Sequence, residues 1–203
     1  MSLIVTGIHT DVGKTEVAAI LTAGLGWTYW KPIQTGHPAD RERISQHGLP
    51  TYPERYHLAL PAAPLVAAQA EGIAIDWAQL AAPPPPGRLV IEGAGGLYVP
   101  ITPRHFLIDL FAQWRLPVIL VVRPYLGAMN HTWLSLRAIQ AHQLPLLGIV
   151  LNGITGDPSE NYFRQTFEVL GEIPWGYTGS LVEVFRTSGL AAHLPERLRA
   201  LNL

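Results

Sequence analysis

The sequence predicts an α/β domain with a mostly parallel β-sheet covered by helices on both faces, and three observations support this. Short apolar runs alternate with segments of helical period, and strands buried on both faces of a parallel sheet show such near-continuous apolar runs. The 203 residues, 48% of them hydrophobic, supply about one domain with a sizeable core. No internal repeat indicates a solenoid. We therefore expect residues 1–203 to form a single domain.

The elements follow from the spacing of apolar residues. Five runs that end in turn or polar residues predict strands over residues 3–6, 28–31, 89–92, 118–122 and 147–151. Helical spacing predicts helices over residues 15–25, 64–71, 77–82, 106–114, 132–142, 160–170 and 195–201. Residues 36–64 are polar and contain scattered prolines, so we expect a long functional loop. The proline tract at 83–87 is expected to be a stiff surface connector.

The composition excludes several classes of function. Fourteen basic side chains oppose 15 acidic ones, for a net charge of −1, so no basic surface is expected for nucleic acid or an anionic membrane. The absence of cysteine excludes disulfides, thiolate metal sites and thiol catalysis. Apolar stretches are too short to span a bilayer, and the N-terminus has no basic signal segment. We expect a cytoplasmic protein with small-molecule partners.

Only two of the 14 basic residues are lysines, Lys14 and Lys31, and the other 12 are arginines. A lysine offers a compact ammonium group on a flexible stem, which differs from the planar fork of an arginine. Where lysine is this rare, its two positions are candidates for chemistry that needs a point charge.

Residues 7–15 have the features of a phosphate-binding loop. A strand over residues 3–6 leads into a turn with two glycines, and a helix opens at Lys14 and Thr15. Backbone amides of such a loop bind phosphate oxygens, the lysine reaches the β and γ phosphates, and the hydroxyl can bind Mg²⁺. The usual first glycine is replaced by Ile8, and a glycine lies one position earlier at Gly7. A strand-to-helix turn without a ligand is the alternative. His9 is expected to be a solvent-facing loop residue.

Polar residues follow three further predicted strands at the edge where open α/β sheets bind ligands. Lys31 ends one strand and Glu92 another. A strand-end acid is costly unless it is paired or metal-bound, and with the Thr15 hydroxyl it fits a Mg–ATP site. Lys31 could instead extend past an apolar surface, and Glu92 could cap backbone amides. Asn152 could bind a purine edge or form an Asn-Gly turn.

Two other acids are less informative from sequence. Asp109 is expected to be structural or on a helix surface, and Asp40 is ambiguous from its spacing alone.

Five segments, residues 7–15, 31–36, 92–96, 126–131 and 171–175, together resemble the dethiobiotin synthetases, the ATP-dependent carboxylases that close the ureido ring in biotin synthesis. The resemblance spans most of the chain, and the displaced glycine looks like that family's own loop. It implies a P-loop NTPase-like fold and an ATP-dependent ligase. The reaction it implies is carboxylation and ring closure of 7,8-diaminononanoate with CO₂ to dethiobiotin, through a carbamate and a carbamic-phosphoric anhydride.

The resemblance also implies a nucleotide and metal site, with ATP as co-substrate and Mg²⁺ as cofactor. The implied metal ligands are Thr15, Asp40 and Glu92. The implied nucleotide-binding residues are Asp11, Val12, Gly13, Lys14, Thr15, Glu92, Asn152 and Pro174, of which Asn152 and the backbone at Pro174 would bind the adenine.

Substrate-binding roles follow from the same resemblance. Thr10 would contact the substrate or the carbamate, and Lys31 would stabilise the carbamate and the transferring phosphoryl group beside Lys14. Thr35 would bind near the diamine. Gly127 and Asn130 would bind the substrate's distal carboxylate across the interface of a homodimer, because an anion is favoured at a helix N-terminus.

The chain departs from the family pattern at Asp11, where glutamate is frequent, at Thr35, where serine is common, and at His9. The 36–64 segment is short for the family, so the role of Asp40 depends on a gapped alignment. The alternative function is a regulatory P-loop ATPase of the partitioning or cell-division-site type. Such switches carry an extra lysine early in the loop and often a basic amphipathic tail, and the sequence shows neither.

Overall fold

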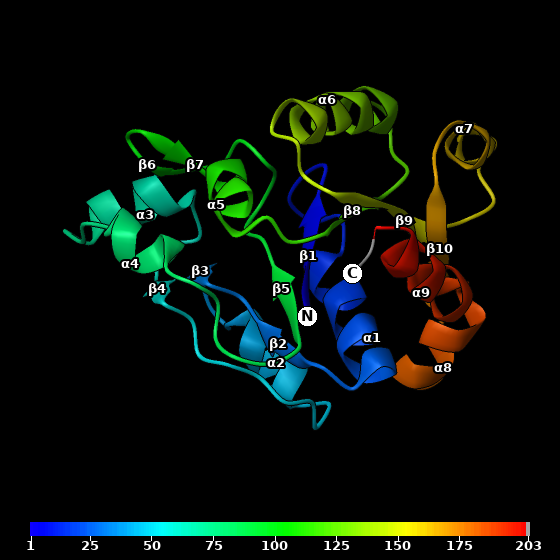
Figure 1. Ribbon diagram of the computed structural model, residues 1–203, viewed down its shortest axis with the longest axis horizontal. Coiled ribbons are helices and arrows are strands. Elements are labelled where there is room, and N and C mark those ends of the chain that lie inside the picture. The colour runs from blue at the N-terminus through cyan, green and yellow to red at the C-terminus, as the bar shows by residue number, and fades with distance from the viewer. Residues whose placement is uncertain (202–203) are drawn as a thin grey trace.

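The computed structural model describes residues 1–201, and its centre is a six-stranded parallel sheet (Figure 1). The strand order is β10-β9-β8-β1-β5-β2, and every neighbouring pair is parallel. The strands are β1 (Ser2–Gly7), β2 (Thr28–Trp30), β5 (Leu89–Glu92), β8 (Val118–Val122), β9 (Leu146–Ile154) and β10 (Val169–Pro174). The predicted parallel sheet is confirmed, with one strand more than expected.

Helices cover both faces of this sheet, as predicted. Figure 1 shows α5 (Leu107–Trp114), α6 (Ala128–Ala141) and α7 (Ser159–Thr166) on one side, and α1 (Lys14–Leu25), α8 (Leu181–Thr187) and α9 (Leu190–Ala200) on the other. All side chains of β1, β5 and β8 are buried between the two helical layers. Burial of each such aliphatic side chain contributes roughly 1.5–3 kcal/mol to folding. Within the described residues, no helix has the length and apolar character needed to cross a bilayer.

A smaller layer lies beyond the β2 edge and corrects the prediction of a long loop over residues 36–64. This segment contains α2 (Asp40–Ser45) and β4 (Tyr56–Leu58), which pairs in parallel with β3 (Ile33–Thr35). Elements of three to six residues are too short to show a period, so the sequence concealed them. The rest of the layer comprises α3 (Pro64–Ala70), α4 (Trp77–Ala81) and the antiparallel pair of β6 (Pro100–Thr102) and β7 (His105–Phe106).

The C-terminal part departs from the predicted elements. The helix predicted over 160–170 ends at Thr166, because Val169 and Leu170 belong to β10. Glycine and glutamate interrupt the apolar run of β10, which hid it as a strand. The last helix begins at Leu190, not at residue 195, and contains Pro195 in its interior. Helix α8 was not predicted at all.

Two further boundaries differ. Helix α6 begins at Ala128, four residues before the predicted start at Thr132, after a left-handed Gly127 with φ 101°. Asp109 accepts a hydrogen bond from the Phe106 backbone N–H at 2.7 Å, so it caps α5 and has the structural role expected for it.

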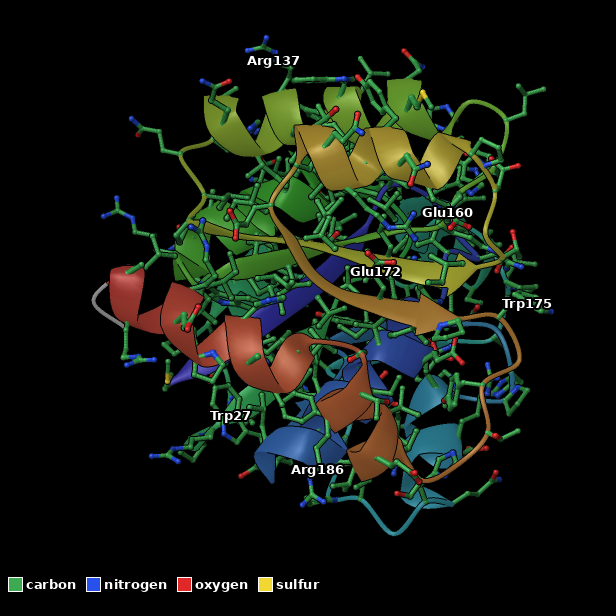
Figure 2. The ribbon with its side chains drawn as sticks, turned by 90° about the vertical axis from the view of Figure 1, so that its right-hand side faces the viewer. Trp27, Arg137, Glu160, Glu172, Trp175 and Arg186 are labelled. Carbon is green, nitrogen blue, oxygen red and sulfur yellow. The ribbon has the colours of Figure 1, made fainter. Side chains whose placement is uncertain are left out.

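An ion-pair network holds the exposed β10 edge to α7. Arg164 donates to Glu172 of β10 at 2.7 Å and to Glu160 of its own helix at 3.2 Å. Both acids lie at this edge of the sheet (Figure 2). Charged side chains on an edge strand also oppose pairing with another chain. The network therefore fixes the strand that borders the Asn152 end of β9.

Candidate active site

The phosphate-binding loop wraps around the Lys14 side chain. Gly13 adopts φ 85° as the N-cap of α1, a left-handed conformation that favours glycine. Lys14 is 6% exposed, and its Nζ donates to the His9 carbonyl oxygen at 2.9 Å. A Cβ at Gly7 would lie 2.6 Å from Val12 Cγ2. A side chain at position 7 would therefore clash with Val12, which explains the glycine at Gly7. The His9 side chain is exposed, as expected.

Burial lowers the pKa of Lys14 from its usual value, although nearby Glu92 opposes the shift. Desolvation disfavours the charged form of a lysine. A bound polyphosphate would supply the missing negative charge, so the site favours an anionic ligand at this ammonium group.

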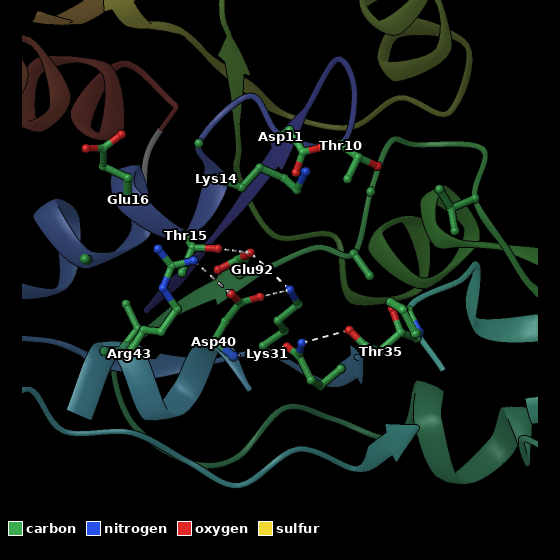
Figure 3. Close-up of a pocket in the computed structure, with 18 of the residues that line it drawn as sticks. Thr10, Asp11, Lys14, Thr15, Glu16, Lys31, Thr35, Asp40, Arg43 and Glu92 are labelled. Carbon is green, nitrogen blue, oxygen red and sulfur yellow. Dashed lines mark hydrogen bonds and ion pairs between the residues drawn. The ribbon is translucent and has the colours of Figure 1, made fainter. Parts of the chain in front are cut away.

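The centre of the site is the carboxylate of Glu92, which is 1% exposed. It accepts hydrogen bonds from Thr15 Oγ1 at 2.9 Å, from the Tyr29 hydroxyl at 2.8 Å and from Lys31 Nζ at 3.2 Å. Lys31 also pairs with Asp40, the first residue of α2 (Figure 3). Thr15, Tyr29, Glu92 and Asp40 come from α1, β2, β5 and α2, and Lys31 directly follows β2. The alternatives of a solvent-directed Lys31 and an amide-capping Glu92 do not match these contacts.

The surrounding carboxylates keep Lys31 charged and Tyr29 neutral. Burial alone would lower the pKa of Lys31, but Glu92 and Asp40 outweigh burial and raise it. Burial and the Glu92 carboxylate raise the pKa of Tyr29 well above its usual value. Lys31 is therefore a fixed ammonium group held by two carboxylates.

The donor set fits Mg²⁺. Asp40, Glu92 and Thr15 are oxygen donors gathered at one point, and the carboxylates already bind one cation, the Lys31 ammonium. No group of three or more acidic, histidine or cysteine side chains suited to a metal occurs within residues 1–201. Mg²⁺ is usually bound by one or two carboxylates together with phosphate and water oxygens, so two carboxylates and a hydroxyl suffice.

A cavity of about 820 Å³ lies over these groups. Nine of the residues selected from the sequence line it: Thr10, Asp11, Gly13, Lys14, Thr15, Lys31, Thr35, Asp40 and Glu92. Thr35 is held by Gln34, whose Nε2 donates to the Thr35 carbonyl oxygen at 3.0 Å. The cavity is large enough for a nucleotide together with a small second substrate.

Several polar residues of this cavity were not predicted from the sequence, among them Glu16, Arg43 and Tyr177. Arg43 lies one turn after Asp40 on α2, with its Nη1 3.9 Å from Asp40 Oδ1. The spacing of three residues between Asp40 and Arg43 places both side chains on one face of a helix. That spacing could have identified Arg43 only if α2 had been predicted. Glu16 follows the phosphate-binding loop directly and could have been suspected from its position.

Asn152 lies within β9 rather than in a turn and is 4% exposed. Its Nδ2 donates to the Val12 carbonyl oxygen at 3.0 Å and to Glu16 Oε2 at 3.1 Å. Its Oδ1 is buried and accepts no hydrogen bond from any described residue. Pro174 ends the neighbouring strand β10. A buried acceptor without a donor is costly, so this position fits a ligand that carries an amino group.

The structure does not bring Gly127 and Asn130 into the same cavity. Asn130 is exposed, and Gly127 lines a separate cavity of about 580 Å³ with Arg123, Tyr125 and Trp175. The Arg123 guanidinium lies 4.2 Å from the centroid of the Trp175 ring. A role for Gly127 and Asn130 in this site would therefore require a second subunit.

Comparisons with known proteins agree with this geometry. A family model described as an AAA domain matches residues 1–178. The ATP-dependent dethiobiotin synthetase BioD of Rhodopseudomonas palustris is 44% identical over 180 residues, which are 85% of this chain and 84% of the relative. The protein of the same name from Afipia carboxidovorans is 42% identical over 205 residues, or 98% of this chain and 92% of the relative.

Among solved structures, a putative plasmid partition protein from Borrelia burgdorferi bound to AMPPNP matches with a TM-score of 0.63. Its sequence identity is 12%, with 97% of this chain and 98% of that chain covered, so the likeness concerns the fold. The P-loop NTPase-like fold is thereby confirmed. Because these relatives are more than two-fifths identical to it over aligned regions that cover at least 84% of each chain, this chain belongs to the ATP-dependent dethiobiotin synthetase family.

Proposed function

We propose that this ATP-dependent ligase is a cyclo-ligase that carboxylates 7,8-diaminononanoate with CO₂ and closes the ring to dethiobiotin, releasing ADP and phosphate. The observation that carries the proposal is the convergence of Lys14 and Lys31 with Thr15, Asp40 and Glu92 in one cavity. The family to which the chain belongs supplies the substrates. A regulatory switch function has only the distant fold likeness to partition proteins in its favour.

The reaction needs two steps before ring closure. One amine of the substrate attacks CO₂, forms an N–C bond and loses a proton to give a carbamate. A carbamate oxygen then attacks the γ-phosphorus of ATP, and the bond to the departing ADP breaks. We propose that the Lys31 ammonium stabilises the negative charge on the carbamate and on the transferring phosphoryl group, because preorganised cations act most strongly in a buried site.

Ring closure completes the sequence. The second amine attacks the carbon of the carbamic-phosphoric anhydride, a new N–C bond forms, and phosphate leaves as a proton is lost. Thr10 and Thr35 line the cavity beside the two lysines, and we propose that they orient the substrate. Holding the amine, the carbamate and the γ-phosphate together is the main contribution of the protein.

We propose that Lys14 holds the β and γ phosphates against the loop amides of Asp11, Val12 and Gly13. Thr15, Asp40 and Glu92 would hold Mg²⁺, which neutralises phosphate charge when bound. Asn152 and the backbone at Pro174 would bind the adenine.

We further propose a homodimer in the cytoplasm, with residues 1–203 acting as one ligase domain. Exposed apolar side chains occur just before α6, at Leu126, and within its first two turns, at Met129, Trp133 and Leu134. Contiguous exposed apolar surface marks a protein interface. A partner seated there would bring its own Gly127 and Asn130 toward the neighbouring site, where they would bind the distal carboxylate of the substrate.

The experiment that tests this function is a product assay by mass spectrometry. Purified protein is incubated with Mg–ATP, bicarbonate and 7,8-diaminononanoate, and dethiobiotin and ADP are quantified. We expect equal amounts of both, and no dethiobiotin when either ATP or the diamine is omitted. ADP formation that is independent of the diamine, without dethiobiotin, would overturn the proposal.

A further inference from the structure

Glu16 is an acid beside a phosphate-binding site, where its charge opposes an anionic ligand. It lines the cavity directly after Thr15 in the first turn of α1. Figure 3 shows it directed away from Lys31, Asp40 and Glu92. It therefore neither pairs with the lysines nor joins the carboxylates that fit a metal, and its presence calls for another role.

The contact that distinguishes Glu16 is with Asn152. Asn152 Nδ2 lies 3.1 Å from Glu16 Oε2 and 3.0 Å from the Val12 carbonyl oxygen. Both neighbours are acceptors only, so the amide nitrogen must face them and the amide oxygen must face the other way. A Cβ at Gly13 would lie 1.9 Å from the same nitrogen. The amide thus packs directly on the phosphate-binding loop in one orientation.

This orientation determines what Asn152 can recognise. Its Oδ1 is left as a buried acceptor that no described residue satisfies, so a ligand that presents a donor here would offset the cost of burying it. A flipped amide would offer a donor instead. Tyr177 lines the same cavity as Glu16, and burial and the Glu16 carboxylate raise the pKa of its hydroxyl. Tyr177 therefore stays neutral beside Glu16.

We propose that Glu16 is a positioning residue that selects the nucleobase by holding the Asn152 amide so that its oxygen accepts from an exocyclic amino group. This inference rests on the proposed use of ATP and concerns a residue that touches neither the phosphates nor the reacting atoms. A 6-amino purine satisfies the acceptor, whereas a 6-oxo purine places a second acceptor against it. Glu16 therefore favours ATP over ITP, which differs from ATP at this position of the base.

The test measures the ratio of the dissociation constants of ITP and ATP by equilibrium binding. The Glu16 side chain is exposed, so its replacement leaves the core intact. In Glu16→Ala we expect the ratio to fall by about tenfold, the effect of one neutral hydrogen bond. Glu16→Gln keeps an acceptor for Nδ2 and should retain most of the preference. Glu196→Ala removes an exposed acid on α9 and should leave the ratio unchanged.

A double-mutant cycle shows whether Glu16 acts through Asn152. Asn152→Ala alone should abolish the preference, and Glu16→Ala should then change the ratio no further. An unchanged ratio in Glu16→Ala, or equal changes in ATP and ITP binding, would overturn the inference while leaving the proposed function intact. A wild-type protein that binds neither nucleotide would contradict both.

Discussion

At the residue scale, the site is an arrangement in which each charge is fixed by its neighbours. Lys31 is held between Asp40 and Glu92, and Glu92 is held in turn by Thr15 and Tyr29. Every one of these groups is paired, so the free energy cost of burying them is limited. The same pairing keeps Lys31 charged and oriented before any substrate binds, which is the preorganisation that transition-state stabilisation requires.

Replacing Lys31 tests this role directly. Lys31→Ala should lower turnover by at least about a hundredfold, because one preorganised donor to the transferring phosphoryl group is lost. ATP binding should weaken much less, since Lys14 and the loop amides are retained. Steady-state turnover and equilibrium ATP binding measure the two effects. Arg186→Gln, an exposed change on α8, serves as the charge control, and near-normal turnover of the Lys31 variant would contradict the role.

The lowered pKa of Lys14 predicts how ATP binding depends on pH. Burial disfavours the ammonium form in the free protein, whereas bound phosphate favours it, so binding takes up a proton once the free lysine is deprotonated. ATP therefore binds with full affinity below the pKa that Lys14 has in the free protein, which lies below 10.5. The affinity falls as the pH rises above that pKa.

Dissociation constants for ATP measured between about pH 7 and 10 should show this loss, accompanied by proton uptake in calorimetry. The Lys14→Met variant should bind weakly with little pH dependence over the same range. Affinity that stays constant until the ordinary lysine value would show that burial does not shift this group.

The residues predictable from sequence were those of local motifs. The phosphate-binding loop can be recognised because Gly13, Lys14 and Thr15 are consecutive and follow a strand. Lys31 and Glu92 could be placed because parallel strands present their carboxyl ends at one edge. Arg43 and Tyr177 could not be assigned because their positions depend on α2 and on the chain after β10, which the sequence did not reveal. Glu16 directly follows Thr15 in α1, so its position gave a signal that the spacing of motif residues alone did not use.

At the element scale, α8 packs against α1 through a small residue that faces a large one. A Cβ at Gly24 would lie 2.1 Å from Cγ of the Phe185 ring. Helix α8 escaped prediction because its seven residues show too few apolar repeats for a period. Strand β10 escaped for a similar reason, since glycine and glutamate interrupt its apolar run.

Gly24→Ala tests this contact. Alanine alone would favour the helix by roughly 0.5–1 kcal/mol, but the clash with Phe185 should dominate and lower the free energy of unfolding by about 1–2 kcal/mol. Denaturant unfolding measures the change. Phe185→Leu in the same chain should relieve much of the clash, giving a coupling energy of about 1 kcal/mol between the two sites. A more stable Gly24→Ala variant would contradict the packing.

At the scale of the whole molecule, the exposed apolar residues of α6 predict self-association. Leu134 is 61% exposed, and an acid there should disrupt a partner without disturbing the core. By sedimentation, the wild-type protein should be a dimer and Leu134→Asp a monomer with reduced activity. Val66→Asp makes the same change on α3, where Val66 is 49% exposed, and should remain dimeric. A monomeric wild-type protein would refute the shared site.

The parallel sheet explains why distant segments form one site. The carboxyl ends of β1, β2 and β5 lie side by side, so the phosphate-binding loop, Lys31 and Glu92 meet although 77 residues separate Thr15 from Glu92. Alternation of apolar strands and helices was enough to predict this architecture. The short elements at its rim depend on tertiary contacts, and the sequence alone did not predict them.

In the proposed reaction, a carbamate formed from CO₂ attacks the γ-phosphate of ATP in this cavity. An oxygen-transfer experiment tests this step. CO₂ labelled with ¹⁸O at both oxygens is supplied with Mg–ATP and the diamine in ordinary water, and the reaction is quenched before the label exchanges. One labelled oxygen should appear in the released phosphate and one in the urea carbonyl of dethiobiotin. Unlabelled phosphate would contradict this mechanism, because ATP would then have been cleaved by water.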